Sequence, residues 1–316
     1  MASIDSFFSE VDLASISLRP FDGFIFLCGG PLADGSSANL SARQYAMTRA
    51  DREGCIAGHK VMIAEKLTNV LHGDDFLDLL EFEEHIAALC ACVLIFVESP
   101  GSIAELGSFS VMTHLANRLL VVCEQRLDSS TSPSFIFLGP IASLRRKRSN
   151  SVQVFPMFND TNMQADVTKM DECWDFIEES MIDSIKRPVS ATKFQPDNLA
   201  HQMLVVAASI DLFAALKLGE IQEIVTRFGI KIEVKQLRKI IKMLEHFNLI
   251  KRVGYGSLDF YMPLGARPLL TLRPVITAKN QIFDQLRFKS DIVLSYKEKD
   301  ARRYKAISAF LKTQQS

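Results

Sequence analysis

The segment Glu98-Ser-Pro-Gly-Ser-Ile-Ala-Glu105-Leu-Gly107 brings together carboxylates, hydroxyls and turn residues. It follows an apolar run over residues 92–97 that is typical of a buried strand. Its proline and glycine favour a turn, and Ser102 is typical of a helix start. A carboxylate at such a position can act as a nucleophile, an acid or a base. Ser102-x-x-Glu105 is also a capping box, in which Glu105 only satisfies a backbone N–H. Spacing alone leaves both interpretations open.

A second motif, Phe26-Leu-Cys-Gly29-Gly30, is a strand that runs into paired glycines. Glycines at this point let the backbone approach a phosphate or sugar, with N–H groups of the next helix as donors. A plain tight turn is the alternative. Arg43 in the first helix can pair with a phosphate through its planar fork, although a solvated helix arginine is the commoner case.

Glu65 and Glu98 are the candidates for a second acid, because each comes just after a predicted strand. Such a group would protonate or orient a leaving group. Either can instead be a surface carboxylate. No G-x-S-x-G, H-E-x-x-H or phosphate-loop motif occurs, and the cysteines and histidines lack metal-ligand spacing. We therefore expect no metal and no acyl-transfer chemistry.

The elements that must position these residues alternate between short apolar runs and helical stretches. Apolar runs without polar alternation indicate strands that are covered on both faces, as in a parallel sheet. Strands alternating with helices predict a doubly wound α/β domain, which binds ligands beyond the strands' carboxyl ends. The predicted strands are 23–28, 60–64, 92–97, 119–123, 135–138 and 152–155, and the predicted helices are 41–53, 79–90, 102–117 and 161–185.

The remaining residues predict a second domain that is mostly helical. A proline-bearing stretch, residues 186–197, is the predicted linker between domains 1–185 and 198–316. Three helices and then a hairpin is the winged-helix order, and Gly254-Tyr-Gly-Ser suits a hairpin tip. Helices are expected at 199–216, 220–228 and 233–247, strands at 249–253 and 258–262, and one or two further helices within 279–316.

Charge divides the chain in the same way. Residues 196–316 carry 20 Lys and Arg against 11 Asp and Glu, a net charge of +9, whereas the preceding residues carry a net −10. A polyanionic partner is therefore expected on the second domain. Its alternatives are a solvated basic face and a surface for protein contacts. The residues predicted to bind nucleic acid are Lys235, Arg238, Lys239, Lys242, Lys251, Arg252 and Tyr255.

Composition places the chain among globular proteins, with 48% hydrophobic and 23% charged residues. No apolar run is long enough to span a bilayer, and the N-terminus lacks the pattern of a signal peptide. The six cysteines fit reduced, structural positions. A cytoplasmic location without membrane contact is the expectation.

Together the two motifs resemble the nucleoside 2-deoxyribosyltransferase family, in which a glutamate at a similar helix start attacks the anomeric carbon. Phe26–Gly30, Glu98–Gly107, the following Phe109 and the two-domain layout are similar to the toxin effectors of type II-A retrons. Those effectors fuse a deoxyribosyltransferase-like domain to a winged-helix domain. Glu65 corresponds to a similarly placed acidic residue in them. The resemblance covers nearly the whole chain.

The resemblance implies a toxin of an anti-phage retron that hydrolyses the N-glycosidic bond of a nucleotide, NAD being the first candidate substrate. It implies control by a reverse transcriptase and multicopy single-stranded DNA with its RNA, in a homo-oligomer or larger assembly, without a cofactor. Base exchange on deoxynucleosides and a non-catalytic nucleotide sensor with a DNA-binding output are the alternatives. The catalytic candidates are Glu105, Glu98 and Glu65; the substrate-binding candidates are Gly29, Gly30, Arg43, Ser99, Gly101 and Ser102.

One departure separates this sequence from the deoxyribosyltransferases. Their accessory acid usually lies six positions before the nucleophile, whereas Glu98 lies seven positions before Glu105. The role of Glu98, and any base or deoxyribose preference transferred from those enzymes, therefore depends on where its side chain points.

Overall fold

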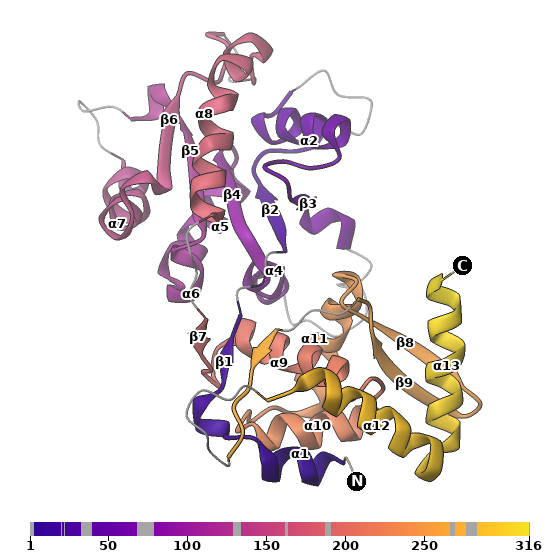
Figure 1. The fold of residues 1–316 in the computed structure, drawn as a ribbon. Coiled ribbons are helices and arrows are strands. Elements are labelled where there is room, and N and C mark those ends of the chain that lie inside the picture. Colours follow the sequence, from indigo (N-terminus) through magenta and orange to yellow (C-terminus); the bar gives the residue numbers. More distant parts are fainter. Residues whose placement is uncertain are drawn as a thin grey trace. The chain divides into compact units, whose positions relative to one another are not determined.

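The computed structural model describes residues 3–19, 21, 23–32, 40–67, 79–128, 134–161, 164–186, 191–265, 269–275 and 283–315. These residues belong to two compact units, which are described separately (Figure 1). The α/β unit consists of the described residues within 22–69 and 78–188. The C-terminal unit consists of those within 1–21 and 189–316.

A fully parallel sheet forms the centre of the α/β unit, as the sequence predicts, and it contains five of the six predicted strands. Its strand order is β3-β2-β4-β5-β6, which is the 2-1-3-4-5 order of doubly wound, flavodoxin-like sheets. The switch in strand order lies between β2 and β4. The strands are β2 (Phe24–Cys28), β3 (Lys60–Met62), β4 (Cys90–Val97), β5 (Leu119–Glu124) and β6 (Val152–Phe155).

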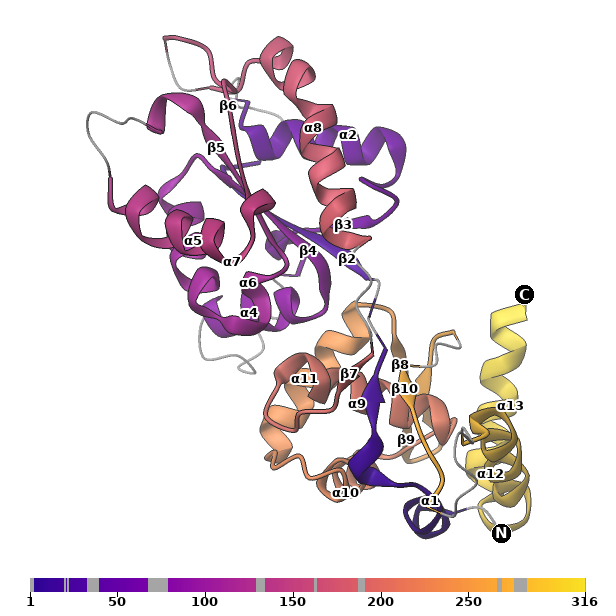
Figure 2. The same cartoon turned by 60° about the vertical axis from the view of Figure 1, so that its left-hand side comes forward.

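Helices cover both faces of this sheet (Figure 2). On one face lie α2 (Ala42–Glu53) and α8 (Val167–Ile185). The other face carries α4 (Leu79–Ala88), α5 (Pro100–Val111), α6 (Thr113–Ala116) and α7 (Ala142–Lys147). Because successive side chains of a strand point to opposite faces, strands β2 and β4 at the centre of this sheet are apolar at every position.

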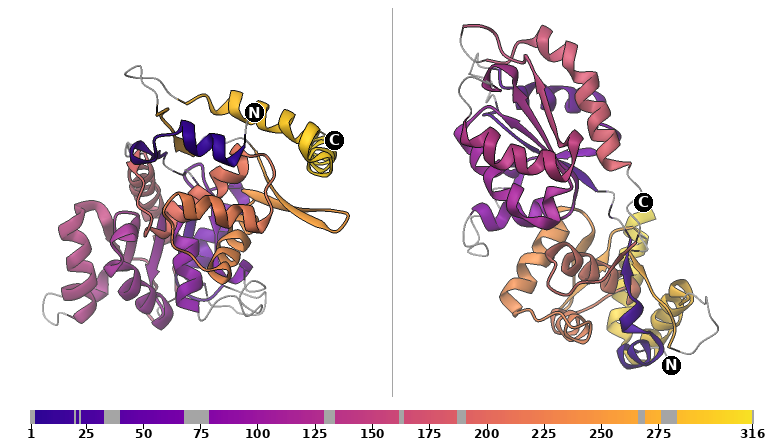
Figure 3. Two further views of the ribbon diagram at one scale, coloured as in Figure 1. Left: turned by 90° about the horizontal axis from the view of Figure 1, so that it is seen from below. Right: turned by 90° about the vertical axis from the view of Figure 1, so that its left-hand side faces the viewer.

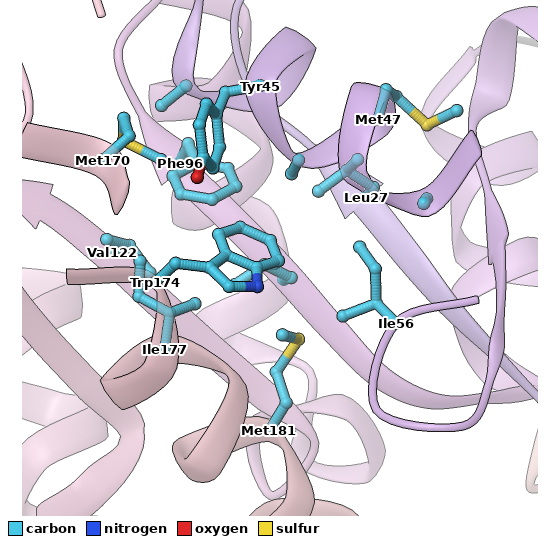
Figure 4. Packing of buried hydrophobic residues seen from close by; sticks show 14 of the residues in the cluster. Leu27, Tyr45, Met47, Ile56, Phe96, Val122, Met170, Trp174, Ile177 and Met181 are labelled. Atoms are coloured by element: carbon cyan, nitrogen blue, oxygen red, sulfur yellow. The ribbon is translucent and has the colours of Figure 1, made fainter. Parts of the chain in front are cut away.

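Trp174 of α8 lies in the middle of the core between the sheet and the α2–α8 face (Figure 4). Leu27 and Phe96 reach this core from neighbouring strands, and Tyr45 reaches it from α2. On the opposite face, the ring of Phe26 packs against Phe109 of α5, with 6.3 Å between centroids. Strand β2 therefore contributes to two cores and holds its carboxyl end rigidly between them.

The predicted strand at 135–138 is wrong, because this segment is helical. Phe137–Ile141 forms a π-helix that runs into α7. Phe135 is 84% exposed and Leu138 66% exposed, whereas Ile141 and Leu144, three residues apart, are buried. Burial therefore follows helical spacing, and a short apolar run cannot distinguish the two states. Helix α8 also begins later than predicted, at Val167, and Met163 lies outside the described residues.

The C-terminal unit has the predicted order of three helices followed by a hairpin. The helices are α9 (Leu199–Leu212), α10 (Leu218–Arg227) and α11 (Val234–His246), and the hairpin pairs β8 (Ile250–Tyr255) with β9 (Leu258–Pro263). Gly256 at the tip has a φ of +62°, a backbone conformation that glycine adopts without strain. Two helices complete the unit, α12 (Gln285–Lys299) and α13 (Ala301–Gln315), and α13 packs against the hairpin.

The N-terminal segment belongs to the C-terminal unit, which corrects the predicted domain 1–185. Strand β1 (Ser17–Leu18) pairs with both β7 (Thr192–Lys193) and β10 (Leu270–Thr271). Part of the predicted linker is therefore a strand. In helix α1 (Ile4–Glu10), Phe7 is fully buried, and the helix lies against the orange and yellow elements of this unit (Figure 3). The rings of the C-terminal unit that surround Phe7 are Phe213, Phe228, Phe283 and Phe288.

Candidate functional site

The predicted catalytic residues converge at the carboxyl edge of the sheet, beside the switch in strand order. Glu98 directly follows β4, and Glu65 lies in a 3-10 helix (Ala64–Leu67) after β3. Glu105 lies on α5, and its charge interacts with Cys28 at the end of β2. Doubly wound sheets bind ligands at this edge, because parallel strands end together there.

Helix α5 is capped without Glu105. The helix begins at Pro100 rather than Ser102, and Ser99 is its N-cap. The Ser99 hydroxyl accepts a hydrogen bond from the Ser102 N–H at 3.1 Å, and the Ser102 hydroxyl accepts one from the Ser99 N–H at 3.0 Å. These two serines form the capping box, so the interpretation of Glu105 as a cap is wrong. Gly101 is exposed in the first turn, where an added Cβ would make only an ordinary contact.

Glu105 has a buried carboxylate oxygen, Oε2, with no hydrogen-bond partner among the described residues. An unpaired buried oxygen costs free energy and calls for an explanation, such as a role in binding or catalysis. Burial raises the pKa of Glu105, and the positive charge of Arg43 and a hydrogen bond with Cys28 oppose that rise. Burial and the charge of Glu105 raise the pKa of the Cys28 thiol well above its usual value, so the thiol stays neutral and donates.

Arg43 and Glu65 form a bidentate ion pair in which both oxygens of Glu65 lie 2.6 Å from guanidinium nitrogens. Arg43 is buried and also donates to the carbonyl of Leu27 at 3.1 Å. Burial raises the pKa of Glu65, but the hydrogen bond from Arg43, a backbone hydrogen bond and the charge of Arg43 together outweigh burial, so the pKa is lowered overall. Glu65 is therefore an ionised partner of Arg43 rather than a proton donor, and the Arg43 fork contacts a carboxylate of the chain itself.

Glu98 points toward the backbone of the neighbouring loop and helix. One oxygen accepts from the N–H of Gly30 at 2.8 Å and of Arg43 at 3.0 Å, and the other accepts from the N–H of Ala42 at 2.7 Å. Burial raises the pKa of Glu98, and these three bonds oppose the rise. A side chain engaged in this way is poorly placed to protonate a leaving group.

The paired glycines allow close packing at the end of β2. A Cβ on Gly29 would lie 2.7 Å from Cβ of Arg43, and a Cβ on Gly30 would lie 3.0 Å from the Glu98 carboxylate. Neither glycine has a positive φ. Side chains of Arg43, Ser41 and Glu98 therefore pack closely against this turn.

Glu83 of α4 is a site residue that the sequence analysis missed. It is 6% exposed, and its charge interacts with those of Glu105, Glu65, Arg43 and Cys28. Burial and the charge of Glu105 raise its pKa to about 8. The signal in the sequence was its place three and four residues before Ile86 and Ala87, on the buried face of an amphipathic helix. Within the described part of the chain, no group of His, Cys, Asp and Glu could hold a metal ion.

The basic residues predicted to bind nucleic acid have different degrees of exposure. Lys235 and Arg238 are exposed on α11, and Lys242 is partly exposed. Lys239 is only 4% exposed, so it does not belong to an accessible basic face. On the hairpin, Lys251 and Arg252 are exposed and Tyr255 is partly buried; Arg252 pairs with Asp259 across the two strands.

Comparison with known proteins identifies the family. The model of the STM3845 retron effector family matches residues 39–252, which include the four glutamates of the site and helices α9 to α11. This match covers more than half of the chain. The chain belongs to the STM3845 retron effector family.

Two curated proteins of Escherichia coli retrons are similar to this effector. A protein of retron Ec86, named as a candidate ribosyltransferase and DNA-binding protein, is 33% identical over 129 residues, which are 40% of this chain and 39% of that protein. A protein of retron Ec73 with the same description is 28% identical over 131 residues, 40% of each chain. The alignments thus span about two fifths of these relatives. No helix in the described ranges of this effector is long and apolar enough to cross a membrane.

Proposed function

We propose that this retron effector is a cytoplasmic toxin whose α/β unit cleaves the N-glycosidic bond of a nucleotide, with Glu105 as the nucleophile. The observation that carries the proposal is the buried, unpaired Oε2 of Glu105 beside the switch in strand order. The capping box of Ser99 and Ser102 removes helix capping as an explanation for this carboxylate. Ribosyltransferase-like relatives support glycosyl-transfer chemistry on a deoxyribosyltransferase-like fold.

In the proposed reaction, Glu105 attacks C1′ of the sugar while the bond from C1′ to the base nitrogen breaks. The bonding electrons leave with the base, and a glycosyl ester forms on Glu105. Water then attacks C1′ and gives up a proton to ionised Glu83 or to solvent, which releases both the sugar and the carboxylate. A neutral base leaves more readily when it is protonated, and Glu83 has the raised pKa of a proton donor. NAD requires no such proton, because its cationic nicotinamide leaves as a neutral molecule.

We further propose that the C-terminal unit is a winged-helix domain that binds the retron's multicopy single-stranded DNA, with its RNA, together with the reverse transcriptase. The order α9-α10-α11-hairpin and the exposed Lys235, Arg238 and Lys251 support this assignment. The curated relatives are named as DNA-binding proteins as well as ribosyltransferases. Membership of the retron effector family supports the proposal that these partners control the α/β unit.

The test compares the wild type with Glu105→Gln. Both proteins are incubated with NAD and a panel of nucleotides, with and without the reverse transcriptase and its DNA, and products are resolved chromatographically. We expect Glu105→Gln to lose cleavage by at least about 10³-fold and to lose any growth toxicity, because the amide is not a nucleophile. The matched control is Glu179→Gln, an exposed glutamate of α8. Cleavage by Glu105→Gln at the wild-type rate would refute the mechanism.

A further inference from the structure

We propose that Glu98 is a positioning residue whose carboxylate occupies the N-terminus of α2, where related folds bind a substrate phosphate. It thereby holds Arg43 beside Glu105 and excludes phosphate from the glycine turn. The exclusion of a substrate phosphate rests on the proposed function, whereas the positioning of Arg43 by Glu98 does not.

The N-terminus of α2 is fully engaged by the protein. The first helical N–H groups lack partners within a helix, and their dipoles attract an anion. Here Glu98 accepts from the N–H of Ala42 and Arg43, at 2.7 and 3.0 Å. The hydroxyl of Ser41 accepts from the N–H of Gln44 at 2.9 Å. The N–H groups of the first three helical residues, 42 to 44, are therefore all bound by side chains of the protein.

The glycine turn before α2 is hydrogen-bonded to residues 98 and 99, which directly follow β4. The N–H of Gly30 donates to Glu98 at 2.8 Å, and the hydroxyl of Ser99 donates to the carbonyl of Gly29 at 3.1 Å. A methyl group on Gly30 would lie 2.9 Å from Cβ of Ser41 and 3.0 Å from the Glu98 carboxylate. Both glycines are therefore needed to let the end of β4 approach this turn.

Arg43 transmits the effect of Glu98 to the site. Its backbone N–H is bound by Glu98, while its guanidinium donates to the Leu27 carbonyl and to Glu65. The same guanidinium charge favours the ionised form of Glu105. A shift of Arg43 would therefore disturb both carboxylates. The phosphates of a nucleotide substrate must be bound elsewhere, with the sugar nearest to Glu105.

Anion rescue tests this proposal on the full chain without requiring any catalytic activity. Thermal midpoints of wild type, Glu98→Ala, Glu98→Gln and the control Glu179→Gln are compared in chloride, formate and phosphate at one ionic strength. We expect Glu98→Ala to melt on the order of 5 °C below wild type, as for a lost cap. Formate and phosphate should restore most of that loss, and should leave wild type and Glu179→Gln unchanged.

Activity then separates positioning from acid catalysis. Glu98→Ala should lose cleavage and regain it with formate, and Glu98→Gln, with one acceptor left, should lose less. The pH profile of both variants should keep the wild-type shape. A Glu98→Ala midpoint equal to wild type and unaffected by either anion overturns the proposal. A Glu98→Gln variant that melts like wild type but lacks one limb of the pH profile also overturns it, because Glu98 would then be the acid. If no nucleotide is cleaved by wild type, the melting data still decide the role of Glu98.

Discussion

Two buried carboxyl groups, those of Glu83 and Glu105, have raised pKa values for partly different reasons. Burial and the neighbouring charge of Glu105 raise the pKa of Glu83 to about 8, so Glu83 keeps its proton at neutral pH. Burial also raises the pKa of Glu105, but Arg43 and the Cys28 thiol oppose it. Active sites assign an acid and a nucleophile to two like groups by such differences. Glu83, and neither Glu65 nor Glu98, has the environment of a proton donor.

We expect Glu83→Gln to slow cleavage of a nucleotide with a neutral leaving base by about 10²-fold and to affect NAD much less. The reason is that only the neutral base gains from protonation as it leaves. In the wild type, the rate with the neutral base should fall as the pH rises through about 8, where Glu83 loses its proton. Steady-state rates for both substrates on either side of that pH measure the effect. An equal loss on both substrates would argue for a purely structural role.

The pH dependence of the free energy of unfolding tests the protonation of Glu83 independently of activity. Its pKa is about 8 in the folded chain and 4.5 ordinarily, so the folded chain retains a proton that the unfolded chain releases. The wild type should therefore lose stability relative to Glu83→Gln as the pH rises from about 4.5 to about 8, and lose no more above that. Each unit of pKa shift corresponds to about 1.4 kcal/mol. Melting curves that run parallel at every pH would contradict a protonated Glu83 in the fold.

At the scale of elements, the sequence predicts those helices and strands that a local residue pattern determines. The parallel strands and the helix order α9-α10-α11 were predictable because apolar runs and helical periodicity are long there. The strand prediction at 135–138 was wrong because a run of four apolar residues fits a strand and a helix equally well. The direction of Glu98 was not predictable either. It depends on how neighbouring elements meet at the sheet edge, which no spacing encodes.

Helix α11 and the hairpin give a prediction at the same scale. We expect the full-length chain to bind single-stranded and hairpin DNA with an affinity that falls steeply with salt, because phosphate contacts release counterions. The double variant Lys235→Glu and Arg238→Glu should weaken binding and flatten the logarithmic salt slope by about 1 to 2. Both side chains are exposed. A salt series with fluorescently labelled DNA measures the slope.

The control for this prediction is Lys60→Glu, which reverses an exposed charge on β3 of the α/β unit. It should leave the slope unchanged. Lys239 should contribute little because it is buried. If the double variant and the control behaved alike, or if the chain bound a protein partner and no nucleic acid, the C-terminal unit would serve assembly instead.

At the scale of the whole chain, the α/β unit is inserted between the first 21 residues and residues 189–316 of the C-terminal unit. The sequence did not reveal this arrangement, because β1, β7 and β10 have two residues each and pair across long separations. A fragment that began at residue 196 would lack β1, β7 and the Phe7 side chain. Binding experiments therefore require the complete chain.

The insertion predicts that Phe7→Ala destabilises the C-terminal unit while sparing the α/β unit. Phe7 is fully buried among four rings of the C-terminal unit, so its truncation should cost about 3 to 5 kcal/mol. The chain's one tryptophan, Trp174, is buried in the α/β unit and reports that unit alone. In urea, the first transition in helical circular dichroism should shift to a lower urea concentration. The midpoint of the Trp174 fluorescence transition should stay at the wild-type concentration. The control Phe135→Ala removes an exposed ring and should change neither signal. A shift of both transitions together would mean that the two units unfold as one, and that the N-terminal segment stabilises the whole chain.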